Sequence, residues 1–248
     1  MYIKIQQFQH SIPVRILKVI CDEISIPISK LIIRSLETGT FPSLLKTSKV
    51  VVSNYRPISL LSHIEKIYEK VMLTRVTSFL DSQNLIYSRQ FGFRNSTLHT
   101  LTVIVEPIRK SLDIGELACA VFVDLQKAFD TVDHQILISK LDHYGIRGPS
   151  KNWFKSYLSD RHQFVSIQNS ESSLKSIRYG VPQGSVLGPL FFLLYINDLH
   201  MAIKFSETFH FADDSHLLHF AKTIRSLCSK VNAYLRSLTT WLNANKMA

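Results

Sequence analysis

The sequence has few of the residues that build covalent or metal-stabilised frameworks. Its 248 residues contain three cysteines, Cys21, Cys119 and Cys228, which lie far apart and form no pair with metal-ligand spacing. An odd, scattered set of cysteines argues against a disulfide framework and fits a reducing compartment. The sequence therefore indicates neither a disulfide-rich secreted domain nor a zinc finger.

Long apolar runs are also lacking. The longest, from Pro189 to Ile196, ends at Asn197 and Asp198, far short of the roughly 20 residues that a membrane-spanning helix needs. The N-terminus does not join a basic start to an apolar block, as a signal peptide does. We expect an intracellular protein, cytoplasmic or nuclear, with no membrane partner.

Acidic residues are in the minority. There are 19 of them against 29 lysines and arginines, which gives a formal net charge of +10. A basic excess suggests a polyanionic partner, most commonly nucleic acid, although scattered basic residues that keep a protein soluble would give the same sum. The length predicts one domain, or one domain with two lobes.

Residue periodicity predicts helices and strands without regular βαβ alternation. Helices are expected at about residues 14–45, 64–79, 135–144, 186–199 and 224–242, and strands at 50–52, 118–123, 164–167, 176–179 and 209–218. Ser62 and Glu65 form a possible capping box before the second helix. This pattern favours an α+β domain, with helices packed on an antiparallel sheet.

Three aspartates follow or interrupt apolar strands. Asp124 ends the run 118–123, which we expect to be a buried strand, and the chain is expected to fold back at Asp213 and Asp214. An ionised carboxylate is costly to bury unless it is paired or bound to metal. Three of them on neighbouring strands predict a site for two Mg²⁺ ions, which suits phosphoryl transfer. The alternative is the Asp-Asp turn of a surface hairpin.

Seven short motifs follow one another along the chain. They are Asn54–Leu61, Gln90–Arg94, Phe122–Asp130, Gly180–Pro189, Tyr195–Leu199, Phe211–Asp214 and Trp241–Lys246. They resemble the boxes of reverse transcriptases from retrotransposons that lack long terminal repeats, from about residue 44 onward. Each box alone is weak, but their ordered coincidence is specific.

The resemblance implies the fingers and palm of a right-hand polymerase, with the thumb absent. Residues 1–117 would form an N-terminal helical segment and fingers. Residues 118–248 would form the palm and include part of the fingers around 146–180. The implied activity is that of an RNA-directed DNA polymerase, with an RNA template, a DNA primer, dNTPs and two Mg²⁺ ions, or Mn²⁺.

The resemblance also implies roles for individual residues. Asp124, Asp213 and Asp214 would be the catalytic, metal-binding carboxylates, with Asp213 the more direct ligand because neighbouring strand residues face opposite sides. The substrate contacts would be Phe129 as a gate below the sugar, Gln183 and Gly184 in the nucleotide pocket, Arg94 on the triphosphate and Arg56 on the template backbone. Without the motifs, Phe129 would be a core residue, Gln183-Gly184 a turn and Arg94 a solvated cation.

The sequence departs from the family pattern in two places. Only Ser53 separates Val52 from Asn54, where the family has a longer basic loop that supplies a lysine. The chain also stops soon after Lys246, before a thumb. We therefore expect a truncated copy with poor activity; the open alternatives are an inactive remnant that only binds nucleic acid and, less favoured, an intron maturase.

Overall fold

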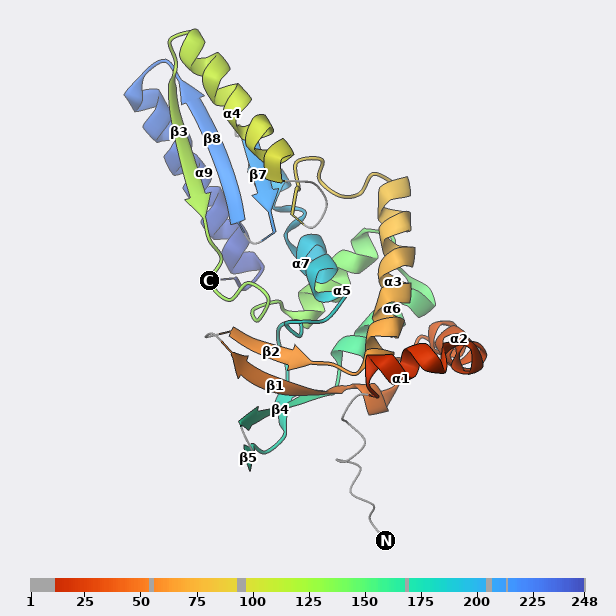
Figure 1. Ribbon diagram of the computed structural model, residues 1–248. Helices are drawn as coiled ribbons and strands as arrows, with labels where there is room; N and C mark the ends of the chain where they lie inside the picture. Colours follow the sequence, from red (N-terminus) through yellow and green to blue (C-terminus); the bar gives the residue numbers. More distant parts are fainter. Residues whose placement is uncertain are drawn as a thin grey trace. The chain divides into compact units, whose positions relative to one another are not determined.

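The computed structural model describes residues 12–53, 56–92, 97–167, 170–203, 207–212 and 214–247. Helices and strands are mixed, as the sequence predicted (Figure 1). The chain divides into two compact units, each described here by itself. Unit 1 comprises Met1–Phe79 with Asp133–Leu190, and unit 2 comprises Leu80–Val132 with Phe191–Ala248. The division into fingers and palm at residue 117 stays a prediction.

Unit 1 contains a mixed sheet. The strands are β1 (Thr47–Ser53), β2 (Arg56–Leu60), β4 (Arg161–Ile167), β5 (Ser170–Glu171) and β6 (Lys175–Ile177). Their order is β2-β1-β4-β5, with β6 also paired to β4. β1 runs parallel to β4, and the other pairs are antiparallel. The strands expected at 164–167 and 176–179 belong to β4 and β6, which pair through Arg161–Gln163 and Lys175–Ile177, whereas Ser166 and Ile167 pair with β5.

Helices complete unit 1. They are α1 (Val14–Val19), α2 (Cys21–Thr38), the 3-10 turn η2 (Ser43–Leu45), α3 (His63–Ser82), α5 (His134–His143) and α6 (Gly148–Leu158). The last residues of α3 belong to unit 2. Phe41 is buried and meets Tyr68, Trp153 and Tyr157 edge to face. This aromatic cluster joins the segment after α2 to α3 and α6.

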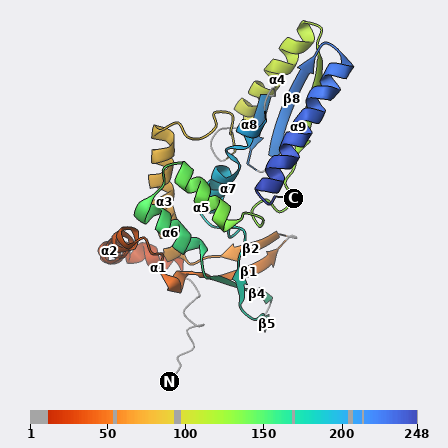
Figure 2. The same cartoon turned by 180° about the vertical axis from the view of Figure 1, so that it is seen from behind.

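Unit 2 contains the antiparallel sheet β3-β8-β7, formed by β3 (Leu117–Val123), β8 (Asp214–Ala221) and β7 (Glu207–Phe211). Helices α4 (Thr97–Asp113) and α9 (Ile224–Ala244) cover opposite faces, as Figures 1 and 2 show from either side. Val103 and Ile104 of α4 pack against the cluster of Phe91, Phe209 and Leu218. On the other face, Tyr234 of α9 meets the His219 ring. The predicted antiparallel sheet backed by helices is confirmed.

The expectation that the strand at residues 118–123 is buried was wrong. β3 pairs only with β8 among the described strands, and much of it is exposed, including Phe122, whose side chain is 70% exposed. β3 is an edge strand, with β8 on one side. An edge strand can have an apolar sequence although many of its side chains are exposed. Its apolar run therefore reports strand propensity and not burial.

The apolar helix predicted at 186–199 is divided into α7 (Gly188–Ile196) and α8 (Leu199–Ala202). Asn197 separates them because its side chain donates to the Leu85 carbonyl and accepts from the Tyr87 amide. Tyr195 of α7 donates to the Asn245 carbonyl after α9, at 2.6 Å. None of the described helices is long and apolar enough to span a membrane.

Candidate active site

Two of the predicted metal ligands stand side by side at one end of the unit 2 sheet. β3 ends at Val123, which pairs with Ser215 of β8. Asp124 directly follows Val123 and Asp214 directly precedes Ser215, so both residues lie at this end of the sheet, and both are exposed. Two hard carboxylate groups on neighbouring strand ends are suitable donors for Mg²⁺.

The hairpin that leads to Asp214 turns one residue earlier than predicted. Phe211 pairs with Asp214, so Asp214 already belongs to β8, and the turn begins at Ala212. Ala212 has a φ of 57°, the left-handed conformation that two-residue hairpin turns require. Asp213 lies outside the described residues, so its role as the more direct ligand stays a prediction. Among the described residues, no group of three or more metal-ligating side chains occurs.

The segment 89–92 lies against this hairpin. The Phe91 amide donates to the His210 carbonyl at 2.8 Å, and the His210 amide donates to the Arg89 carbonyl at 3.0 Å. A Cβ on Gly92 would lie 2.0 Å from the Ala212 nitrogen. The glycine of the Gln90–Arg94 motif therefore permits the backbone to touch the turn, a role that the sequence interpretation missed.

A buried polar pair also links the two strands of the hairpin. His210 Nδ1 and Ser215 Oγ are 2.8 Å apart and join β7 to β8 across the turn. Burial lowers the pKa of His210 to about 4, with further lowering from His200 and His216, so the ring is neutral near pH 7. Tyr87 adds a hydrogen bond to Thr208 of β7. The hairpin is thus held by backbone bonds along the edge of β7 and by side-chain bonds within unit 2.

Phe129 lies in the loop that follows β3. Leu125 and Ala128 are buried, whereas Phe129 is half-buried. Its ring lies 5.0 Å from that of Phe192 on α7, with the planes tilted by 30°. One part of the ring therefore belongs to the core, and the rest is accessible.

The predicted nucleotide-pocket residues lie in unit 1, in the loop before α7. Gly184 has a φ of 101°, and a Cβ there would lie 3.0 Å from the Ser59 carbonyl oxygen. The Ser59 amide of β2 donates to the Gln183 carbonyl at 2.8 Å. His134 Nε2 lies 2.7 Å from the Gly180 carbonyl oxygen. One backbone bond from β2 and one side chain from α5 thus hold the two arms of the loop.

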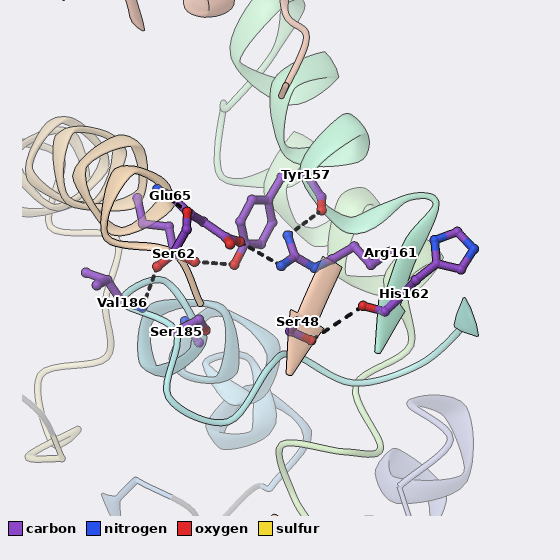
Figure 3. Close-up of polar contacts among 10 residues, drawn as sticks. Ser48, Ser62, Glu65, Tyr157, Arg161, His162, Ser185 and Val186 are labelled. Carbon is purple, nitrogen blue, oxygen red and sulfur yellow. Dashed lines mark hydrogen bonds and ion pairs between the residues drawn. The ribbon is translucent and has the colours of Figure 1, made fainter. Parts of the chain in front are cut away.

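A third attachment comes from α3. The Val186 amide donates to Glu69 Oε2 at 2.8 Å, and Tyr157 donates its hydroxyl proton to Glu69 Oε1. Figure 3 shows Tyr157, Arg161, Glu65 and Val186 converging near this point. The sequence interpretation missed Glu69; its signal was two acids four residues apart on an otherwise apolar helix face.

The predicted capping box is only half correct. The Glu65 amide donates to Ser62 Oγ at 3.0 Å, as expected. The Glu65 carboxylate does not return to Ser62, because its Oε1 accepts from Arg161 Nη2 at 2.6 Å. Among the described residues, Glu65 Oε2 has no hydrogen-bond partner. A buried guanidinium competes better for this carboxylate than a backbone amide does.

Two predicted substrate contacts cannot be placed. Arg94 lies outside the described residues. The backbone of Arg56 begins β2, and its side chain is outside the described part of the chain. Their roles on the triphosphate and the template stay predictions.

Comparison with known proteins identifies the family. The model of the family described as reverse transcriptase (RNA-dependent DNA polymerase) matches residues 44–248. The probable RNA-directed DNA polymerase from transposon BS of Drosophila melanogaster is 36% identical over 197 residues, which cover 76% of this chain and 22% of that protein. The RNA-directed DNA polymerase from mobile element jockey of the same species is 31% identical over 242 residues, or 86% of this chain and 26% of that protein.

The chain thus spans about a quarter of the length of these relatives. Among solved structures, the apo telomerase of Candida Tropicalis truncated from its C-terminal domain is similar in fold. The TM-score is 0.58 and the identity 14%, over 79% of this chain and 47% of that one. The motifs, the family model and the relatives agree, so the chain belongs to the reverse transcriptase family and is related to the RNA-directed DNA polymerases of retrotransposons lacking long terminal repeats.

Proposed function

We propose that this chain is the polymerase core of a retrotransposon reverse transcriptase, which adds dNTPs to a primer 3′ end on an RNA template. The observation that carries the proposal is the antiparallel pair of Val123 with Ser215, which brings the next residues, Asp124 and Asp214, to the same exposed end of the unit 2 sheet. Family membership supports the same chemistry. A surface Asp-Asp turn would not need a third carboxylate at the end of the neighbouring strand.

In this proposal Asp124, Asp213 and Asp214 hold two Mg²⁺ ions, or Mn²⁺. Bound there, the metals would stabilise the charge on the attacking and leaving oxygens of phosphoryl transfer. Phe129 lies below the sugar and excludes a 2′-hydroxyl, and Gln183 with Gly184 lines the nucleotide. Arg94 binds the triphosphate through its forked guanidinium, and Arg56 contacts the template backbone.

Primer extension on an RNA template tests this function. The purified chain is expected to extend a DNA primer in Mg²⁺ or Mn²⁺. Asp124→Asn and Asp213→Asn should each lower the rate by about a hundredfold or more, because a neutral amide holds a divalent cation poorly. Asp113→Asn is the matched control, since Asp113 is an exposed carboxylate at the end of α4, before β3 begins.

The possible results separate the two readings of the chain. Extension that survives Asp124→Asn would remove this residue from the metal site. A wild-type chain that binds template and primer but never extends would instead favour the inactive remnant. Such binding should weaken steeply with salt, because released counterions dominate the affinity of basic proteins for nucleic acid.

A further inference from the structure

The loop that carries Gln183 and Gly184, here called the pocket loop, is attached to a buried polar cluster. None of the cluster's side chains is among the predicted nucleotide contacts. We define this cluster as Glu65, Glu69, Tyr157 and Arg161, of which Figure 3 labels Glu65, Tyr157 and Arg161. All four side chains are at most 1% exposed. They come from α3, from α6 and from the start of β4. A charged cluster so deeply buried is a weak contributor to stability, which raises the question of what it holds in place.

Glu69 has the hydrogen-bonding pattern of an ionised carboxylate. It accepts the Val186 amide at Oε2 and the Tyr157 hydroxyl at Oε1, and an ionised carboxylate is an acceptor only. The guanidinium of Arg161 bonds to Glu65 and also lies 4.7 Å from the centroid of the Tyr157 ring. The cluster thus places a positive charge near both carboxylates and fixes the direction in which Glu69 points.

The amide that Glu69 holds lies two residues after Gly184. The intervening turn is short and tightly bonded, because the Ser185 amide donates to the Pro182 carbonyl at 3.0 Å. Ser185 Oγ also accepts from the Gly188 amide at 3.0 Å, where α7 begins. A displacement of Val186 is therefore transmitted to the backbone of Gln183 and Gly184.

We propose that Glu69 is a positioning residue, which sets the backbone of the Gln183-Gly184 pocket through the Val186 amide. The inference rests on the proposed function, in which this loop lines the incoming nucleotide. Glu69 touches no substrate itself. Its loss is expected to loosen the pocket while the carboxylates at Asp124 and Asp214 keep their places within unit 2.

Three substitutions separate positioning from stability. Glu69→Leu removes both acceptors at similar volume, whereas Glu69→Gln keeps one oxygen for the Val186 amide. Tyr157→Phe is the matched control, because it deletes the other bond to Glu69 in the same cluster but leaves the Val186 amide bonded. If Glu69→Leu does not fold, Glu69→Asp replaces it, with its oxygens withdrawn by ~1.5 Å.

Two measurements are made on each full-length variant. The first is amide hydrogen exchange at Val186, which does not depend on activity. The second is the KM for dNTP and the kcat in primer extension. Glu69→Leu should speed Val186 exchange and raise the KM about tenfold, the change expected for a lost bond to a charged acceptor. Glu69→Gln and Tyr157→Phe should stay within about threefold of wild type.

Each result decides the inference. Unchanged Val186 exchange in Glu69→Leu would overturn it, whatever the activity. Faster exchange with the same KM in Glu69→Leu and Tyr157→Phe would also overturn it, because the cluster would then be merely structural. A wild-type chain without polymerase activity would contradict the proposed function, and with it the nucleotide role of the loop, while the exchange data would still report whether Glu69 holds the Val186 amide.

Discussion

The Phe129 ring is packed on one side and exposed on the other. Its ring packs on Phe192 from one side, as a core residue would, yet the residue is only half-buried. A ring anchored in this way is rigid, because its rotamer is fixed by packing. Rigidity is what a gate needs, so the core interpretation and the gate hypothesis do not compete at this position.

Replacing Phe129 by valine should therefore relax sugar selection. The smaller side chain opens space beside the 2′ position, so the ratio of kcat/KM for matched ribonucleotides over deoxynucleotides should rise about tenfold or more. The lost packing against Phe192 should lower the free energy of unfolding by about 1–2 kcal/mol. Phe122→Val is the matched control, since Phe122 is exposed on β3. An unchanged ratio would show that Phe129 is a core residue and does not act as a gate.

The place of a single residue could be predicted where the residue belongs to a recognised motif. It could not be predicted where the residue's role depends on a partner far away in the sequence. Asp124 stands where the sequence placed it, after a strand and beside the hairpin. Glu65 was misjudged because its partner Arg161 is 96 residues away in sequence. No local pattern reveals such a pair. Periodicity indicates which face of a helix is buried, but it does not identify the charged residue from another element that packs against that face.

At the scale of elements, the hairpin β7–β8 depends on a segment from before α4. Residues 89–92 bond to His210, and Gly92 touches the turn at Ala212. The motif around Gly92 was assigned to the fingers by resemblance alone. Within unit 2 its backbone acts as a support for the carboxylate-bearing turn.

A methyl group on Gly92 should disturb catalysis. In Gly92→Ala, the added carbon would lie 2.0 Å from the Ala212 nitrogen and 2.7 Å from its Cα, so the turn must move. Misplacing catalytic groups by about 1 Å costs on the order of a hundredfold in rate. Primer-extension kcat measures the loss, and circular dichroism checks folding.

Gly115→Ala supplies the comparison for this change. A Cβ there has nothing within 4 Å, although the φ of +75° adds strain, worth about 1 kcal/mol. Near-normal kcat is expected for it. Wild-type kcat in Gly92→Ala would show that the turn at Ala212 moves without consequence for the chemistry.

Elements with a clean period were predicted, and those with mixed signals were not. Helices α3, α5 and α9 lie where the helical spacing of apolar residues predicted them. α4 was missed because it contains Pro107 and a run of β-branched residues, and α6 because it opens on Gly148-Pro149, which favours a turn. In both cases tertiary packing decides against local propensity.

At the scale of the whole molecule, the buried cluster makes stability depend on pH. Burial raises the pKa of Glu65 to about 7, from 4.5, against the opposing effect of Arg161. The pKa of Glu69 is raised by burial too. A group that binds its proton more tightly when folded stabilises the protein fully below the lower pKa, and this contribution is lost as the pH rises towards the higher one.

Glu65→Gln should remove part of this dependence. The amide imitates the protonated carboxyl, so between pH 5 and pH 8 the wild type should lose about 2 kcal/mol of unfolding free energy relative to the variant. Urea unfolding at both pH values measures the difference. The buried His134 and His210, whose pKa values are lowered by burial, contribute with the opposite sign but equally to both proteins. Parallel pH profiles would show that Glu65 does not titrate in this range.

The two compact units are each assembled from two separated stretches of chain. Unit 1 needs residues up to Leu190, and unit 2 needs residues both before Val132 and after Phe191. During synthesis from the N-terminus, the first stretch of either unit must wait for its second before it can close. Consequently, no single cut along the chain releases either unit whole, and during synthesis the apolar surface of residues 1–79 stays unfinished until residues 133–190 have emerged, when chaperones would be most needed.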